Sequence, residues 1–248
     1  MNYVEYGKEN SNVIILLHGG GLSWWNYKEA AEMLQSDYRV ILPILDGHSN
    51  CDRDFLTIEE NAREIIEFVD EQFRDSVLLL GGLSLGAQIV LEILSKRRNI
   101  CRYAIVESAL VIPSKLTYSM IKPAFGSCYG LIRHRWFSKL QFQSLRIKPE
   151  LFEDYYRDTC GIAKDNMIAF LQENSLYFLK QNIKDCEAEV YIFVGEKENP
   201  TMRKSAVIIH EKLKNSFLEV LPNRYHGEFS INHAKDYVAQ ILKIVGQK

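Results

Sequence analysis

Short apolar runs rich in Val and Ile alternate with longer segments of helical period along most of the 248-residue chain. Runs of the first kind are typical of strands buried on both faces, and the longer segments are typical of helices that cover a sheet. The alternation predicts an α/β fold, a mostly parallel central sheet flanked by helices. Predicted strands are residues 13–17, 38–42, 77–80, 103–106, 190–194 and 217–221, with 3–6 as an edge strand. Predicted helices are residues 27–35, 58–73, 85–96, 202–213 and 234–245.

One segment, residues 113–185, breaks this alternation because it is helical and aromatic and contains no convincing strand. We expect a helical cap insertion at 113–185 between two parts of one α/β core, residues 1–112 and 186–248. Ordinary core packing and an apolar lid over a site both account for its aromatic side chains. A run of basic residues within it is better explained as a solvated helix face than as an anion-attracting rim. That run is Arg133, Arg135, Lys139, Arg146 and Lys148.

Charge and cysteine content restrict the class of partner and the compartment. The formal net charge is −2, which gives no reason to expect nucleic acid or an anionic membrane as partner. Five cysteines without a CxxC pair argue against a disulfide framework, and the first residues lack the pattern of a signal peptide. Residues 77–94 reach membrane-spanning length but contain glycines and polar residues, so a strand followed by a buried helix explains them better. We therefore expect a cytoplasmic protein with a small-molecule partner and no membrane span, and nothing in the sequence specifies its oligomeric state.

A glycine-flanked serine follows one of the predicted strands directly. The sequence Gly82-Leu83-Ser84-Leu85-Gly86 links the strand 77–80 to the helix 85–96. This GxSxG pattern presents a serine nucleophile on a tight, strained turn, where larger side chains on either side would collide with neighbouring elements. Serine is a poor nucleophile at neutral pH, so the chemistry requires a histidine as base and a carboxylate to orient it.

Both partners of the serine follow later strands in the chain. His226 lies in the loop after the last predicted strand, and Glu198 lies in the loop after the strand before it. The carboxyl ends of parallel strands meet at one edge of a sheet, so we expect these side chains to lie near Ser84. Glu196, in the same loop as Glu198, and Glu107, at the end of the strand before the insertion, remain alternatives for the acid.

The order serine, acid, histidine with a GxSxG turn resembles the α/β-hydrolase fold family. The resemblance extends over nearly the whole chain, from His18-Gly19-Gly20-Gly21 to His226, and in that family an HG dipeptide opens the oxyanion loop. It implies that the backbone N–H groups of Gly20 and Leu85 form the oxyanion hole and that the insertion is a helical cap. The sequence departs from the family at the acid, where aspartate is more common than the glutamate at position 198.

The remaining histidines and loop motifs give no sign of a cofactor. His18 and His48 are expected to be structural, and no histidines are spaced as in HExxH or another metal-ligand pattern. The dinucleotide fingerprint GxGxxG and the phosphate loop GxxxxGK are both absent from the sequence. We expect neither a metal nor a cofactor.

These observations predict a serine hydrolase that cleaves a carboxylic ester or a related small acyl substrate, such as a lactone or thioester, through an acyl-enzyme. The fold also supports other chemistry, so a C–C bond hydrolase, a lyase or a peptidase is an alternative. A ligand-binding protein with vestigial hydrolysis is a further alternative, because a glutamate in a poor position would leave His226 badly oriented.

Overall fold

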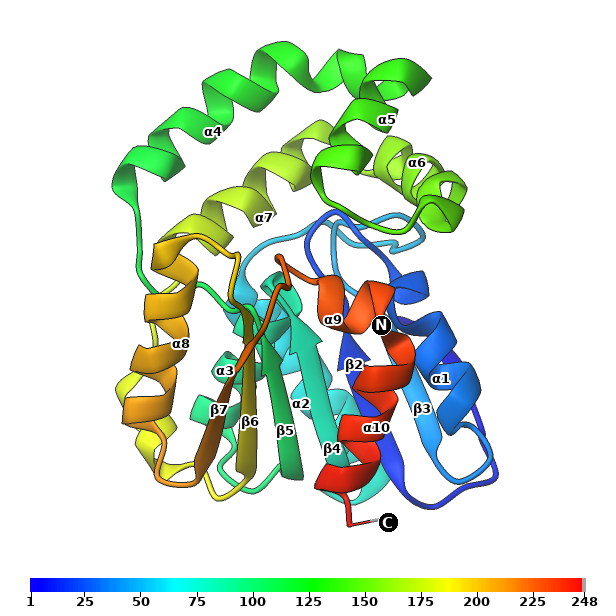
Figure 1. Ribbon diagram of the computed structural model, residues 1–248, viewed down its shortest axis with the longest axis vertical. Coiled ribbons are helices and arrows are strands. Elements are labelled where there is room, and N and C mark those ends of the chain that lie inside the picture. Colours follow the sequence, from blue (N-terminus) through cyan, green and yellow to red (C-terminus); the bar gives the residue numbers. More distant parts are fainter. Residues whose placement is uncertain (247–248) are drawn as a thin grey trace.

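The computed structural model describes residues 1–246 and has one seven-stranded sheet in the order β1-β3-β2-β4-β5-β6-β7 (Figure 1). Only the pair formed by β1 and β3 is antiparallel, and the other neighbouring strands are parallel. The predicted mostly parallel sheet is confirmed, including its N-terminal edge strand. The strands are β1 (Asn2–Tyr6), β2 (Val13–Leu17), β3 (Arg39–Ile44), β4 (Val77–Leu83), β5 (Cys101–Glu107), β6 (Glu189–Gly195) and β7 (Ser216–Leu221).

Helices cover both faces of the sheet, because alternate residues of its central strands are apolar on either side. In β2, Ile14 and Leu16 belong to one hydrophobic cluster and Ile15 and Leu17 to the other. The helices α1 (Lys28–Leu34) and α10 (Ala234–Ile244) pack into the first cluster. The other face is covered by α2 (Ile58–Phe73), α3 (Leu85–Lys96) and α8 (Pro200–Lys212) (Figure 1).

One predicted helix begins slightly later than expected, and one observed helix was not predicted. In the segment 27–35 the helix α1 begins at Lys28, because a 3-10 turn, η1 (Trp24–Tyr27), precedes it. A short helix, α9 (Glu228–Asn232), follows the loop of His226 and was not predicted. Five residues are too few to show a helical period, so α9 had no sequence signal. Residues 77–94 form β4 and most of α3, and none of the helices within residues 1–246 is long and apolar enough to cross a membrane.

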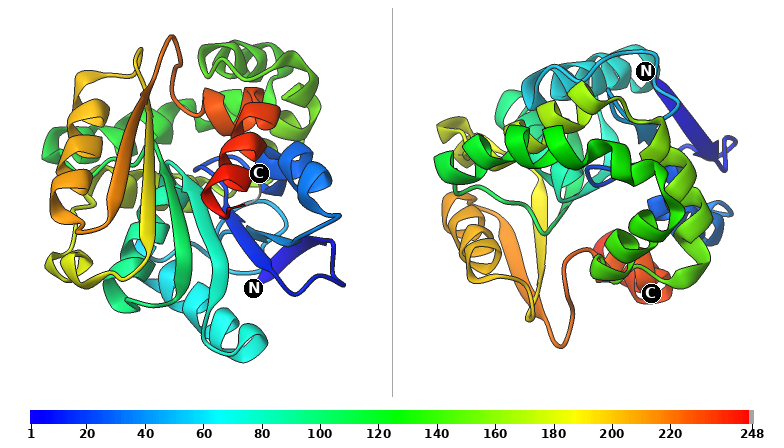
Figure 2. Two further views of the ribbon diagram at one scale, coloured as in Figure 1. Left: turned by 60° about the horizontal axis from the view of Figure 1, so that its bottom comes forward. Right: turned by 90° about the horizontal axis from the view of Figure 1, so that it is seen from above.

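Between β5 and β6 the chain forms four helices, here called the cap helices, which lie over the carboxyl edge of the sheet (Figures 1 and 2). They are α4 (Lys115–Cys128), α5 (Arg135–Ser144), α6 (Phe152–Gly161) and α7 (Lys164–Leu176), with 3-10 turns η2 (Tyr129–Arg133), η3 (Pro149–Leu151) and η4 (Gln181–Asp185). The two chain segments that enter and leave this region touch, because Ser114 N–H donates to the Ser175 carbonyl over 2.8 Å. The division into core and cap at residues 112 and 185 stays a prediction.

Candidate active site

Ser84 has an unusual backbone conformation at the turn between β4 and α3. Its φ of 54° and ψ of −112° lie outside the helical and extended regions. A Cβ on Gly86 would lie 2.2 Å from the Leu17 carbonyl oxygen, and one on Gly82 would lie 2.4 Å from the Gly86 backbone. Contacts this short exclude any side chain at either position. The two glycines therefore allow β2 and α3 to close around a strained, half-buried serine.

Glu198 and His226 form a direct hydrogen-bonded pair. The ring nitrogen Nδ1 of His226 lies 2.8 Å from Oε2 of Glu198. The Glu198 side chain is 1% exposed, whereas that of His226 is 43% exposed. A Cβ on Gly227 would lie 3.2 Å from the Leu83 side chain, so the residues next to His226 and Ser84 in sequence are packed together.

No hydrogen bond joins Ser84 Oγ to His226 among the described residues. In ligand-free enzymes this contact is often long and shortens only when substrate is bound. The structure thus places both side chains at the same edge of the sheet, with the imidazole already oriented by its carboxylate.

The second oxygen of Glu198 is held by two further donors. The Ser108 hydroxyl and the Gly195 N–H each donate to Oε1 over 2.7 Å. Burial by itself raises the pKa of this carboxyl, but hydrogen bonding and charge from His226, then the bonds from Ser108 and Gly195, lower it below the usual value. Glu198 is therefore charged at neutral pH. Ser108 is a site residue that the sequence analysis missed, and its only signal is its place after a strand end.

The two alternative acids are placed away from the imidazole and hold the surrounding loop instead. Glu196 Oε2 accepts a 2.8 Å hydrogen bond from the Asn223 N–H. Glu107 Oε1 accepts one of 3.3 Å from the Ser230 N–H in the first turn of α9. Of the three glutamates, only Glu198 contacts the His226 ring. The other two fix the loop of His226 from both sides.

The glycine-rich loop after β2 brings Gly20 against the residue that follows Ser84. A Cβ on Gly20 would lie 3.5 Å from the Leu85 side chain and 3.3 Å from the ring of Phe170 on α7. Within residues 1–246 the backbone N–H groups of Gly20 and Leu85 have no protein acceptor. Two unpaired N–H groups beside a nucleophile are the arrangement that binds an oxyanion.

His18 and His48 support this loop as hydrogen-bond acceptors. His18 Nε2 accepts from the Leu45 N–H over 3.1 Å, and His48 Nε2 accepts from the Gly21 N–H over 3.0 Å. Burial lowers the pKa of His48 to about 4 and that of His18 well below its usual value. Both rings are therefore neutral at physiological pH, as an acceptor nitrogen requires. Their contacts are structural ones.

A cavity of about 140 Å³ opens beside Gly20, beneath the cap helices. It is lined by the glycine-rich loop after β2 and by side chains from the region α4 to α7. Its lining residues are Gly20, Gly21, Leu22, Phe125, Ile132, Gln141, Leu145, Tyr155, Thr159, Met167, Phe170 and Leu171.

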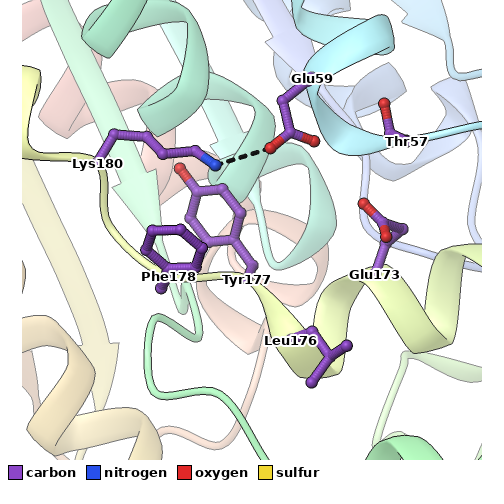
Figure 3. A pocket seen from close by; sticks show the side chains of 7 residues that line it. All are labelled: Thr57, Glu59, Glu173, Leu176, Tyr177, Phe178 and Lys180. Atoms are coloured by element: carbon purple, nitrogen blue, oxygen red, sulfur yellow. Dashed lines mark hydrogen bonds and ion pairs between the residues drawn. The ribbon is translucent and has the colours of Figure 1, made fainter.

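A second cavity, of about 250 Å³, lies where α7 meets the core and contains none of the predicted site residues (Figure 3). Lys180 crosses it and donates to Glu59 of α2 over 2.7 Å, with its ammonium 4.4 Å from the Phe178 ring centre. Lys180 also lies 3.9 Å from Glu92, a carboxylate that is almost wholly buried in α3. Burial raises the pKa of Glu173 at the opposite wall. This cavity is a polar junction between cap and core.

Most of the basic run is exposed, and two of its members, Arg146 and Lys148, meet residues outside the insertion, whereas Arg135 pairs within it. Lys148 and Arg135 form ion pairs with Glu29 and Glu153. The Arg146 guanidinium lies 3.8 Å above the ring centre of Tyr225, the residue before His226. Within residues 1–246 no group of three His, Cys, Asp or Glu side chains is placed to hold a metal.

Comparison with known proteins identifies the family and the fold. Residues 14–241 match the sequence model of the alpha/beta hydrolase family. This range contains the loops that carry Ser84, Glu198 and His226. An esterase from Thermogutta terrifontis is 16% identical, with a TM-score of 0.80 over 98% of this chain and 93% of that one. A lipase-esterase related protein from Clostridium acetobutylicum is 22% identical, with a TM-score of 0.75 over 98% of both chains.

An enol-lactonase from Burkholderia xenovorans is 11% identical, with a TM-score of 0.79 over 98% of this chain and 95% of that one. At these identities the likeness shows a shared fold. No curated protein matches the sequence. The family match covers most of the sheet and every strand-end loop described above, and it agrees with the family that the GxSxG pattern predicted. The chain belongs to the alpha/beta hydrolase family.

Proposed function

We propose that the protein is a serine hydrolase that cleaves a carboxylic ester, or a related small acyl substrate such as a lactone or thioester. The observation that carries the proposal is the hydrogen-bonded pair of Glu198 and His226 at the same sheet edge as the strained Ser84. The esterase and the enol-lactonase of similar fold support this class of reaction.

In the proposed mechanism, Ser84 Oγ attacks the substrate carbonyl while His226 Nε2 takes its proton. Glu198 holds Nδ1 and stabilises the imidazolium that forms. The N–H groups of Gly20 and Leu85 bind the oxyanion, and each such donor contributes on the order of a hundredfold to a thousandfold in rate. His226 then protonates the leaving group, and water attacks the acyl-enzyme with His226 as base. The mechanism needs no metal or cofactor.

The cap helices would close over the acyl-enzyme and exclude water other than the attacking molecule. We place the cap at residues 113–185, as the sequence predicted. The five cysteines are all free thiols, which supports a reducing compartment such as the cytoplasm.

Hydrolysis of p-nitrophenyl esters of increasing acyl length, with Ser84→Ala and His226→Ala alongside, tests the proposal. We expect turnover in the unmodified protein and a loss of at least a thousandfold in both variants. No turnover of any ester, or activity that survives Ser84→Ala, would contradict the mechanism and favour a lyase or a binding role.

The identity of the acid is tested with three isosteric variants. Glu198→Gln removes the charge that faces His226, whereas Glu196→Gln and Glu107→Gln keep an oxygen acceptor for the backbone N–H groups of Asn223 and Ser230. We expect kcat to fall by two or more orders of magnitude only in Glu198→Gln. An equal loss in Glu107→Gln would give the acid role to Glu107.

A further inference from the structure

A loop of the insertion is fixed against the segment that follows His226. The loop joins α5 to η3 and contains Arg146 and Lys148. Asn232, the last residue of α9, accepts a hydrogen bond from the Lys148 N–H over 2.9 Å and donates one to the Arg146 carbonyl over 2.7 Å. Because α9 directly follows the loop of His226, one short segment of chain positions both His226 and the backbone of Arg146.

The backbone of Arg146 is strained in this loop. Its φ of 57° is in the left-handed region, which few residues other than glycine adopt. Such strain persists only where the surrounding structure imposes it, and strained residues cluster at binding and catalytic sites. Here the hydrogen bonds to Asn232 impose it. The strained conformation gives a charged side chain a fixed starting point beside the loop of His226.

Two cations lie near the ring of Tyr225, the residue that precedes His226. The guanidinium of Arg146 lies 3.8 Å from the ring centre, and the ammonium of Lys197 lies 5.5 Å from it. Lys197 in turn directly precedes Glu198. Two positive charges, one from the insertion and one from the loop of the candidate acid, therefore meet next to the pair of Glu198 and His226.

Neither cation has a carboxylate partner within residues 1–246. The acids of the neighbouring loops are used otherwise, since Glu196 and Glu228 each accept a backbone N–H over 2.8 Å. Asp236 forms its ion pair with Arg224. The side chains of both cations are exposed, so an anion from solution can reach them. Two unpaired cations beside one ring form a place where a negatively charged group is attracted.

We infer that Arg146 and Lys197 bind an anionic group, such as a carboxylate, on the leaving-group side of the substrate. In the proposed mechanism His226 protonates the leaving group, so that part of the substrate lies beside this ring. A guanidinium donates two parallel N–H groups to a carboxylate, and an ammonium adds a second positive charge. The inference rests on the proposed function, because the role of His226 assigns the leaving-group side.

The test compares two aryl acetates that differ in charge, 4-acetoxybenzoate and 4-acetoxybenzamide. Each kcat/KM is divided by the rate constant for hydroxide hydrolysis of the same ester, which removes the difference in intrinsic reactivity. We expect this normalised value to be about tenfold higher for the anionic ester, because charge-assisted hydrogen bonds hold its carboxylate. Added salt should reduce the preference, since it screens charges at the surface.

Variants of the two cations show whether they cause the preference. We expect Arg146→Gln to reduce it by about fivefold or more and Lys197→Gln by about twofold or more, whereas Arg146→Lys should keep part of it. A purely structural contact between Arg146 and Tyr225 would affect both esters equally. Arg102→Gln is the matched control, because Arg102 is exposed and lies 5.1 Å from the Tyr103 ring centre at the amino end of β5. It should leave the preference unchanged.

Calorimetry on the Ser84→Ala protein adds a readout that does not depend on turnover. We expect 4-hydroxybenzoate to bind more tightly than 4-hydroxybenzamide, and Arg146→Gln in the same background to remove the difference. The inference is overturned if the two esters have equal normalised kcat/KM, or if the preference survives in Arg146→Gln. Failure of the proposed function is a different result, in which neither ester is hydrolysed or Ser84→Ala keeps its activity.

Discussion

Ser108 has a strained backbone conformation, and its hydroxyl donates a hydrogen bond to the carboxylate of Glu198. Its φ of 55° is in the left-handed region, which residues other than glycine rarely adopt. Its N–H donates to the Phe193 carbonyl over 2.9 Å, and its hydroxyl donates to Glu198. The strained conformation therefore turns the side chain from the end of β5 toward the loop after β6. Ser108 acts through Glu198, which makes it a positioning residue.

Two substitutions at Ser108 separate the hydroxyl from the backbone strain. Ser108→Ala removes the hydroxyl and keeps the strain, whereas Ser108→Gly removes the hydroxyl and relieves the strain. A hydrogen bond to a charged group contributes about 1.5–3 kcal/mol, so we expect kcat to fall by about tenfold or more in both variants, with little change in KM. Steady-state kinetics on a p-nitrophenyl ester measure this. An active glycine variant beside an inactive alanine variant would show that Ser108 matters only for the backbone.

The sequence was sufficient to propose Ser84, His226 and Glu198 as candidate site residues, because each follows a predicted strand. It was insufficient to find Ser108, because a single serine after a strand has no distinguishing pattern. The choice among three glutamates also needed coordinates. Glu196 and Glu198 share the turn after Gly195 and Glu107 ends β5, and the sequence does not show which of these side chains points at the imidazole.

The turn between β4 and α3 has no space for a side chain at Gly82 or Gly86. A Cβ on Gly86 would lie 2.2 Å from the Leu17 carbonyl oxygen and 2.6 Å from that of His18, both fixed backbone atoms. We expect Gly86→Ala to reduce the free energy of unfolding by about 1–3 kcal/mol and to lower kcat/KM, because the oxyanion loop must shift. Urea unfolding and ester hydrolysis measure the two effects.

Gly126→Ala is the matched control, since Gly126 lies inside α4 and its Cβ would meet only the Lys164 ammonium at 4.0 Å. Alanine is favoured over glycine in a helix by about 0.5–1 kcal/mol, so this variant should be more stable than the unmodified protein. Equal effects of the two substitutions would argue against the steric explanation at Gly86.

The helix α3 also fixes both ends of the cap segment through one side chain. Gln88, which is fully buried, donates through Nε2 to the Leu110 carbonyl over 2.7 Å and to the Asn174 carbonyl over 3.0 Å. Its Oε1 accepts from the Asn174 side chain over 2.9 Å. A single amide therefore joins the helix after Ser84 to Leu110, before the first cap helix, and to Asn174 in α7, the last one.

Replacing Gln88 by Leu keeps the volume and removes all three hydrogen bonds. The polar atoms of Leu110 and Asn174 then lose a partner, and we expect the free energy of unfolding to fall by about 2 kcal/mol or more. Trypsin should also cleave the cap segment faster, because its two ends are no longer held together. Gln181→Leu, at an exposed position in η4, is the control and should change neither measurement. A cap that resists trypsin equally in both variants would contradict this role.

The strands of the sheet were predictable from the sequence, whereas the packing of the cap helices was not. Strands such as β2 and β4 are buried on both faces, so their apolar runs are nearly continuous and distinct from the helices between them. In the cap helices some apolar side chains are buried and others are exposed to solvent. Trp136 is 66% exposed and Phe142 is buried, although both lie on α5. The sequence pattern therefore predicted helices in this region. It did not predict which face of each helix is buried against the rest of the protein.

The protein core contains a buried acid that the proposed mechanism does not use. Glu107 is 1% exposed, and its Oε2 has no hydrogen-bond partner within residues 1–246. The side chains of Tyr27 in η1 and Tyr237 in α10 are fully buried near it, and burial followed by the nearby charge of Glu107 raises the pKa of the Tyr237 hydroxyl. Burial raises the pKa of Glu107 to about 7, despite hydrogen bonds from Ser230 that lower it. The carboxyl is thus largely protonated in the folded protein below neutral pH.

This buried proton makes the stability of the whole molecule depend on pH. Between pH 4.5, the ordinary pKa, and pH 7 the folded state keeps the Glu107 proton and the unfolded state has lost it, so the free energy of unfolding falls as pH rises. The loss from this group is on the order of 3 kcal/mol and is complete above its folded pKa. Glu107→Gln stays neutral and keeps an acceptor for Ser230. In urea unfolding, its stability relative to the unmodified protein should therefore increase from pH 4.5 to pH 8. A difference between the two proteins that stays constant over this range would show that Glu107 does not keep its proton in the fold.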